Sequence, residues 1–196
     1  MKTTTLFIII TAIISTAAGQ TPFKKYDTKS GIVTYETIMK MGTLELKSKS
    51  VVSFDDYGMK ECRETYSNNK LTESYFSDGN DIYAVKHNQK KAYRQGPAYR
   101  GTELRVEWTE FGTEKDRQSG VIKKIPAKKF AGKDCEMFES NDGKGTVTQY
   151  GGWNKILMYL HVKSKNVESI QSATKVEENA KVTADKFAIP KGFSVQ

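Results

Sequence analysis

Short segments that alternate between apolar and polar residues, each closed by turn residues, constrain this chain more than any other feature of its sequence. In the clearest segment, every second residue from Leu44 to Phe54 shares one face, and charged residues between them share the other. A period of two is typical of a strand with one buried and one solvated face. Because turn residues recur roughly every 10–15 positions, the sequence predicts a meander, a sandwich or a barrel, and a mainly β fold.

The densest apolar run outside the N-terminus lies at Trp153–Lys163. As a strand, it carries Ile156, Met158, Leu160 and Val162 on one face and Leu157 and Tyr159 on the other. A short run that is apolar on both faces suits a strand covered on both sides, although its periodicity alone leaves a helix open. We therefore expect this stretch to lie at the centre of one antiparallel sheet, with strands at Thr146–Trp153 and Leu157–Lys163.

The rhythm of strands breaks at residues 101–112. Leu104, Trp108 and Phe111 have the i, i+4 and i+7 spacing that places them on one face of a helix. Leu104, Val106 and Trp108 also alternate, so a strand is the alternative. We predict a helix whose apolar face packs against the concave side of the sheet.

The N-terminus has the pattern of a secretory signal. Lys2 supplies a positive charge, residues 6–14 form a short apolar core, and small residues follow. Ala17 and Gly19, at the −3 and −1 positions, predict cleavage before Gln20, with a cut one residue earlier as the alternative. The apolar core is too short to span a bilayer, which needs about 20 residues.

We expect residues 1–19 to be a signal peptide and residues 20–196 to be a single domain, periplasmic or extracellular. No cysteine lies near the predicted cut and no other segment is long enough to span a membrane, so we expect a soluble protein without a lipid anchor. An oxidising compartment allows a disulfide between Cys62 and Cys135. Two buried free thiols are the alternative.

The sequence contains no motif for catalysis, a metal or a cofactor. His87 and His161 are its two histidines and lie far apart, no Gly-x-Ser-x-Gly occurs, and no glycine-rich loop could cradle a phosphate. The pair Gly151-Gly152 predicts a bulge instead. We therefore predict neither a cofactor nor a metal site nor enzymatic activity.

The formal net charge of +8 favours anionic partners, or simply keeps strand faces and edges soluble. Tyrosines interleave with basic residues over positions 83–100, a pattern that could stack on bases or contact lipid headgroups. The alternative is a solvated hairpin face with cross-strand pairs between tyrosine and lysine. Export makes nucleic acid the less fitting anion, so we expect no nucleic-acid partner.

Three stretches resemble one family of proteins. They are Asp-Asp-Tyr-Gly-Met-Lys-Glu at 55–61, Phe-Ala-Gly-Lys-Asp-Cys-Glu-Met-Phe at 130–138, and an ending that runs from Trp-Asn-Lys-Ile at 153–156 to Asp-Lys-Phe-Ala-Ile-Pro-Lys-Gly-Phe at 185–193. The family is a domain of uncharacterised function in bacterial envelope proteins, related to the LolA/LolB lipoprotein-carrier superfamily. The resemblance implies a strongly curved antiparallel sheet, a half-open barrel with helix packed in or across its concave face. It identifies no functional residue.

Export, a curved sheet and a basic surface together favour binding rather than catalysis. We expect a non-enzymatic protein that holds an acyl chain or another hydrophobe in an apolar cavity, with a basic rim for an anionic headgroup. The residues expected to contact this ligand are Leu104, Trp108 and Phe111. The alternative is a protein-interaction module of the envelope, whose core is filled by its own side chains and whose partner the sequence does not indicate.

Overall fold

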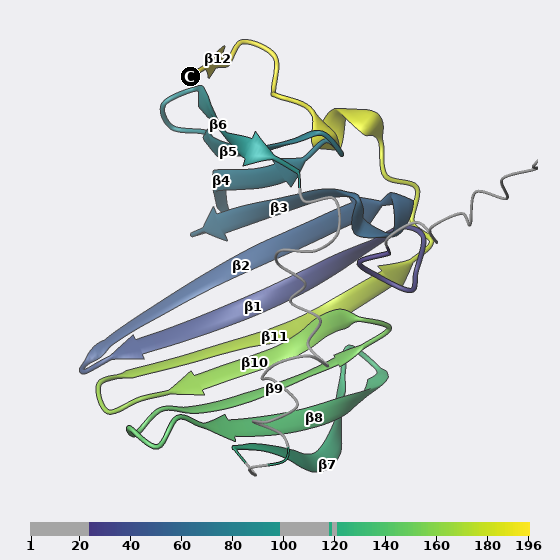
Figure 1. The fold of residues 1–196 in the computed structure, drawn as a ribbon. Helices are drawn as coiled ribbons and strands as arrows, with labels where there is room; N and C mark the ends of the chain where they lie inside the picture. The colour runs from purple at the N-terminus through teal and green to yellow at the C-terminus, as the bar shows by residue number, and fades with distance from the viewer. Residues whose placement is uncertain (1–23, 99–117, 119–120) are drawn as a thin grey trace, which may run out of the picture.

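A computed structural model describes residues 24–98, 118 and 121–196 of the chain. Most of them belong to twelve strands (Figure 1). The strands are β1 (Gly31–Met41), β2 (Leu44–Asp55), β3 (Lys60–Ser67), β4 (Lys70–Ser77), β5 (Asp81–Lys86), β6 (Lys91–Pro97), β7 (Ile122–Phe130), β8 (Lys133–Asn141), β9 (Val147–Trp153), β10 (Ile156–Lys163), β11 (Val167–Glu178) and β12 (Ser194–Val195). Two short 3-10 helices are η1 (Asp56–Gly58) and η3 (Ala184–Phe187).

All twelve strands belong to one sheet, in the order β12-β6-β5-β4-β3-β2-β1-β11-β10-β9-β8-β7. Neighbouring strands pair antiparallel, except that the two-residue β12 lies parallel to β6. The sheet is open, because its edge strands β12 and β7 do not pair with each other. A mainly β fold built on a single antiparallel sheet is therefore confirmed.

The middle of the sheet is formed by β1 and β2, not by the apolar run at Trp153–Lys163. The run spans the end of β9 and all of β10, because the chain turns at Asn154 and Lys155, whose φ angles are 49° and 61°. A two-residue hairpin turn needs such positive angles, which asparagine adopts more readily than most residues. The two expected strands are confirmed, but the predicted central position was wrong, because β9 and β10 lie third and fourth from the β7 edge.

A bulge lies between β9 and β10. Their register shifts opposite Gly151-Gly152, with Met158 as the extra residue of β10. A Cβ atom added at Gly151 would lie only 2.3 Å from the sulfur of Met137 in β8. The bulge predicted from the glycine pair is confirmed, and the close approach of β8 explains why a side chain is not tolerated there.

The sheet curls strongly toward its β7 edge. The rings of Phe130 in β7 and Tyr159 in β10 stack with centroids 4.6 Å apart, although β8 and β9 lie between these strands. A flat sheet would hold β7 and β10 about 14 Å apart. The hydroxyl of Tyr35 in β1 also reaches across β11 and donates to the carbonyl oxygen of Leu157 in β10, over 3.0 Å. Contacts between strands that are not neighbours place these side chains on the inside of the curve.

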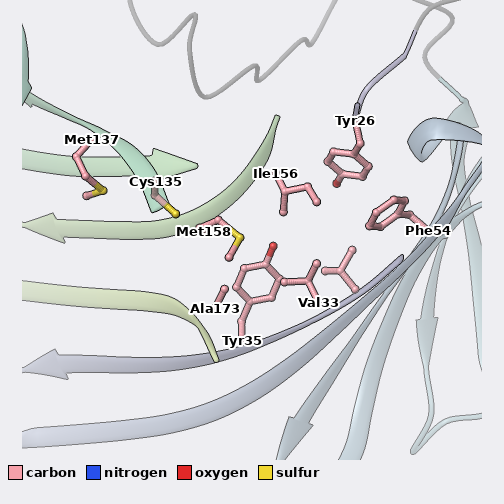
Figure 2. Packing of buried hydrophobic residues seen from close by; sticks show 10 residues of the cluster. Tyr26, Val33, Tyr35, Phe54, Cys135, Met137, Ile156, Met158 and Ala173 are labelled. Atoms are coloured by element: carbon pink, nitrogen blue, oxygen red, sulfur yellow. The ribbon is translucent and has the colours of Figure 1, made fainter. Parts of the chain in front are cut away.

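The main buried cluster fills the inside of this curve (Figure 2). Its buried members come from β1, β2, β8, β10, β11 and the segment before β1: Tyr26, Val33, Tyr35, Val52, Phe54, Cys135, Met137, Ile156, Met158 and Ala173. We call this the inner cluster. The face of β1–β4 that carries Val33 and Phe54 is called the inner face.

Tyr26 fixes the segment before β1 over the inner cluster. Its ring lies 4.5 Å from that of Phe54, and its backbone N–H donates to the carbonyl oxygen of Tyr57 over 3.0 Å. A Cβ atom at Gly58 would come within 2.7 Å of the Tyr26 ring. Although this segment is polar in composition, one aromatic residue makes it part of the core.

The opposite, outer face of β3–β6 is covered by the C-terminal part of the chain. Cys62 belongs to this face, because it pairs with Ser53 and therefore points away from the neighbouring Phe54. The outer cluster consists of buried Cys62, Phe76, Val85, Ala92 and Phe187, with Tyr83, Val182, Ile189 and Phe193 packed against them. The chain thus covers the outer face of these strands with its own ending.

The predicted helix, with Leu104, Trp108 and Phe111, lies outside the described residues. Over residues 24–98 and 121–196 the elements are strands and two single-turn 3-10 helices, so the structure gives no support for a helix packed against the concave face. Within the part of the chain that the structure describes, no helix is long and apolar enough to cross a membrane.

Cys62 and Cys135 are both buried and free. Cys62 packs in the outer cluster and Cys135 in the inner cluster, so the two thiols belong to separate cores. The structure therefore contains two buried free thiols, which pack as small apolar side chains, and not the predicted disulfide.

Candidate ligand-binding face

The inner face is buried at one end of its long strands and exposed at the other. β1 and β2 pair over their whole length without a break in register, so alternate residues from Val33 to Met41 and from Leu44 to Phe54 point to the same side. Val33 and Phe54 are each 1% exposed, whereas Leu44 is 50% and Leu46 is 48% exposed. Along the same strands, one face passes from core to open surface.

Exposed apolar side chains gather on this face. Among the described residues six large apolar side chains are exposed, and four of them belong to the inner face: Met41, Leu44, Leu46 and Tyr75. Tyr75 of β4 belongs there because it pairs with Arg63, which pairs with Val52 of β2. Met41, Leu44 and Leu46 lie together at the end of the β1–β2 hairpin, and we call these three residues the apolar patch. Tyr75 lies apart from them, beside Arg63. A gathering of exposed apolar side chains is typical of a binding surface.

A cation lies between the buried and the exposed parts of the inner face. Nη1 of Arg63 in β3 donates to Oε1 of Gln171 in β11 over 3.4 Å, and its guanidinium carbon lies 5.6 Å from the centroid of the Tyr35 ring. To make these contacts the half-buried Arg63 side chain crosses over β2 and β1. No carboxylate within the described ranges forms an ion pair with it.

Ser50 of β2 is a second unusual polar group on this face. It pairs with Tyr35 on one side and with Thr65 on the other, one position along from the pair of Val52 with Arg63 on the same face. Its residue is 7% exposed, and its Oγ atom is buried without a hydrogen-bond partner among the described residues. A buried hydroxyl without a partner costs about 1–3 kcal/mol of stability.

The nearest acid on the inner face, Glu61, already has partners. Its carboxylate accepts hydrogen bonds from Lys25 Nζ over 2.5 Å and from the Tyr26 hydroxyl over 2.6 Å. Burial raises the pKa of Glu61, but Lys25 and Tyr26, with help from Arg63, lower this pKa by more, so that it ends below its ordinary value. Burial beside Glu61 raises the pKa of Tyr26. Glu61 is therefore ionised, both of its described hydrogen bonds are accepted by Oε2, and Arg63 forms no described ion pair with it.

The predicted ligand contacts Leu104, Trp108 and Phe111 lie outside the described residues. The sequence did place Leu44 and Leu46 on the face of Phe54, but nothing in it distinguished the exposed half of that face from the buried half. Arg63 and Gln171 were missed because the pairing of β1 with both β2 and β11 brings together residues far apart in the chain.

The two histidines are held by ordinary contacts. The ring Nε2 of His87 lies 2.7 Å from the hydroxyl of Ser74, and that of His161 lies 2.9 Å from a carboxylate oxygen of Glu168. Over the described residues, no group of three or more histidines, cysteines and acids could hold a metal ion.

The hairpin of β5 and β6 fits the alternative of a solvated face, because its charged side chains form ion pairs. Lys86 pairs with Glu73, and Arg94 pairs with Asp81 over 2.6 Å. The ring of Tyr83 stacks on Phe76 in the outer cluster, with centroids 5.1 Å apart. Several of the residues that suggested a basic and aromatic surface are therefore occupied by contacts within the chain.

The fold is similar to that of several solved structures. An uncharacterized conserved protein from Thermus thermophilus matches with a TM-score of 0.58 and 5% identity, over 86% of this chain and 90% of that one. MucB, in the MucA/MucB complex of Pseudomonas aeruginosa, matches with a TM-score of 0.52 and 8% identity, over 87% of this chain and 59% of the other. LolA superfamily protein NE2245 from Nitrosomonas europaea matches with a TM-score of 0.41 and 9% identity, over 84% and 94% of the two chains.

No protein-family model and no curated protein matches the sequence. The three stretches of sequence resemble a domain family related to the LolA/LolB superfamily, and a LolA superfamily protein is among the structural matches. At these identities the likeness concerns the fold alone, so the function has to be inferred from the inner face itself.

Proposed function

We propose that this protein is an exported, non-enzymatic binding protein that holds an acyl chain or a similar hydrophobe against the inner face of its curved sheet. The apolar patch carries the proposal, because its three side chains remain exposed on the face that elsewhere forms the core. Covering apolar surface stabilises a complex by about 25 cal/mol for each Å² removed from water. The signal-like N-terminus supports export.

A titration with dansyl-labelled undecanoic acid tests this proposal. The informative variant is Leu44→Gln with Leu46→Gln, and the matched control is Val195→Gln, because Val195 in β12 is 54% exposed and lies outside the patch. We expect the double variant to weaken binding about tenfold or more, and the control to bind as the wild type does. Equal binding by all three proteins, with unchanged melting temperatures, would contradict the proposal.

A protein-interaction module is the second candidate. It is supported by the filled inner cluster, where Met137 and Met158 are completely buried, and by MucB, a protein of similar fold that was solved in complex with MucA. In that case a protein partner covers the apolar patch. Mass spectrometry of the protein purified from its native envelope separates the two functions. A stoichiometric acyl lipid supports the carrier, whereas a stable complex with one protein and no lipid supports the module.

A further inference from the structure

Arg63 has hydrogen-bonding capacity that its described surroundings leave unused. A guanidinium group carries five N–H donors in a fixed plane. The described contacts of Arg63 are one long hydrogen bond of 3.4 Å to Gln171 and the approach to the Tyr35 ring. The described partners of Glu61 are Lys25 and Tyr26, and no described hydrogen bond or ion pair joins Glu61 to the remaining donors of Arg63.

Ser50 gives an independent indication at the same place. Its side chain shares the inner face with Arg63 and lies diagonally opposite it, on the neighbouring strand and two residues from Val52, the pairing partner of Arg63. Buried hydroxyl groups nearly always have a partner, yet Ser50 Oγ has none within the described part of the chain. A buried donor without an acceptor beside a cation with spare donors is the arrangement expected where an anionic group of another molecule binds.

Apolar residues lie on this face in both directions along β2, with the pair of Ser48 and Thr37 between Ser50 and Leu46. Val52 and Phe54 lead into the inner cluster, and Leu46 and Leu44 lead outward to the apolar patch. At the rise of a strand, Leu46 lies about 14 Å and Leu44 about 20 Å from Ser50, so an extended acyl chain that starts at this pair reaches the apolar patch. Such an arrangement fits a molecule with one polar end and one extended apolar chain.

We infer that Arg63 and Ser50, with Gln171, form a binding site for the carboxylate or phosphate headgroup of an acyl ligand whose chain lies over the apolar patch. This inference rests on the proposed function and names the class of ligand. Two oxygens of the headgroup accept hydrogen bonds from the planar guanidinium of Arg63, and Ser50 Oγ donates to one of them. A neutral headgroup lacks the charge that makes these hydrogen bonds strong.

Calorimetric titrations below the micelle concentration test the inference on the wild-type protein. The ligands are dodecanoate, dodecyl phosphate and dodecanol, with acetate and inorganic phosphate as anions that lack the chain. We expect the two anionic lipids to bind about tenfold or more tightly than dodecanol, and acetate and phosphate to bind far more weakly. Tight binding of inorganic phosphate or acetate would overturn the inference, because the site would then take free anions.

Variants show which residues cause the preference for an anionic headgroup. Arg63→Gln removes the charge and should abolish the preference for dodecanoate over dodecanol, while Arg63→Lys, which keeps the charge without the planar fork, should retain part of it. Ser50→Ala should weaken dodecanoate several-fold. The control Arg94→Gln, which removes an exposed arginine of β6 paired with Asp81, should leave the preference unchanged. The melting temperature of each variant shows whether it is folded.

The outcomes separate this inference from the proposed function. If no acyl ligand binds the wild-type protein, the proposed function fails and the headgroup site fails with it. If dodecanol binds as tightly as dodecanoate to the wild-type protein, the proposed function stands and the headgroup site is wrong. The wild-type comparison decides this even if Arg63→Gln does not fold.

Discussion

The two faces of β3 are covered in different ways. On the outer face, Cys62 packs under the C-terminal segment, and Glu64 accepts a hydrogen bond from Lys186 of that segment over 2.7 Å. On the inner face, the described contacts leave donors of Arg63 unused and the neighbouring Ser50 hydroxyl without a partner. Where the chain covers a face with its own residues, it satisfies the polar atoms there. Unsatisfied groups beside exposed apolar side chains therefore indicate the face that is left for another molecule.

Removing the cover of the outer face should have the largest effect. Phe187 of η3 is buried in the outer cluster, so Phe187→Ala should lower the free energy of unfolding by about 3–5 kcal/mol. Tyr75→Ala removes an exposed aromatic ring of the inner face and should change it by about 0.5 kcal/mol or less. Urea denaturation of both variants measures the difference. Equal losses would mean that the inner face is as tightly packed as the outer one.

Two serines provide a more precise comparison, because each is 7% exposed. Ser74 of the outer face has His87 as a partner at 2.7 Å, whereas Ser50 of the inner face has none among the described residues. Ser74→Ala should lower the free energy of unfolding by about 1 kcal/mol, and Ser50→Ala should raise it by about 1 kcal/mol in the absence of ligand. If Ser50→Ala destabilises the protein as Ser74→Ala does, the hydroxyl has a partner in solution and the contrast between the faces disappears.

The acid of the inner face should make stability depend on pH. The pKa of Glu61 is lower in the folded protein than its ordinary value of 4.5, since Lys25 and Tyr26 outweigh the effect of burial. The stability that Glu61 contributes is therefore complete above that ordinary value and is lost as the pH falls through the lower, folded value. Urea midpoints measured from neutral to acidic pH should fall more steeply for the wild type than for Glu61→Gln. Parallel curves would show that the Glu61 contacts do not persist in solution.

The strand pattern of the sequence was sufficient to predict a single antiparallel sheet. Alternation from Leu44 to Phe54 identified the residues that share a face, and the register of β1 with β2 confirms it. Alternation could not show that Leu44 is exposed to solvent while Phe54 is buried, because exposure depends on what covers each half of the strand. The central position expected for the apolar run was wrong because the order of strands depends on pairings between distant parts of the chain, such as β1 with β11.

The polar part of the candidate site could not be predicted from sequence. Arg63 and Gln171 are separated by 108 positions, and they meet only because β1 pairs with β2 on one side and with β11 on the other. A serine such as Ser50 inside a strand carries no signal of its own, since its missing partner is a property of the packed face. The helix with Leu104, Trp108 and Phe111 remains a prediction.

The smallest expected effect concerns the thiols, one in each cluster. Burial raises the pKa of Cys62 to about 12 and also raises the pKa of Cys135, so little reactive thiolate exists at neutral pH. We expect iodoacetamide to modify neither residue in the native protein and both after unfolding without a reductant. Mass spectrometry counts the carbamidomethyl groups that iodoacetamide adds to the protein. No modification after unfolding would restore the disulfide between the two cores.

Photolabelling tests the central claim, that the inner face binds an acyl ligand, most directly. A dodecanoate analogue with a diazirine at the end of its chain is bound to the protein, irradiated, and mapped by peptide mass spectrometry. We expect labels on the peptides that contain Met41, Leu44 or Leu46, and competition by unlabelled dodecanoate. Labels confined to peptides of the outer face or around Val195, or no label that dodecanoate displaces, would contradict the account.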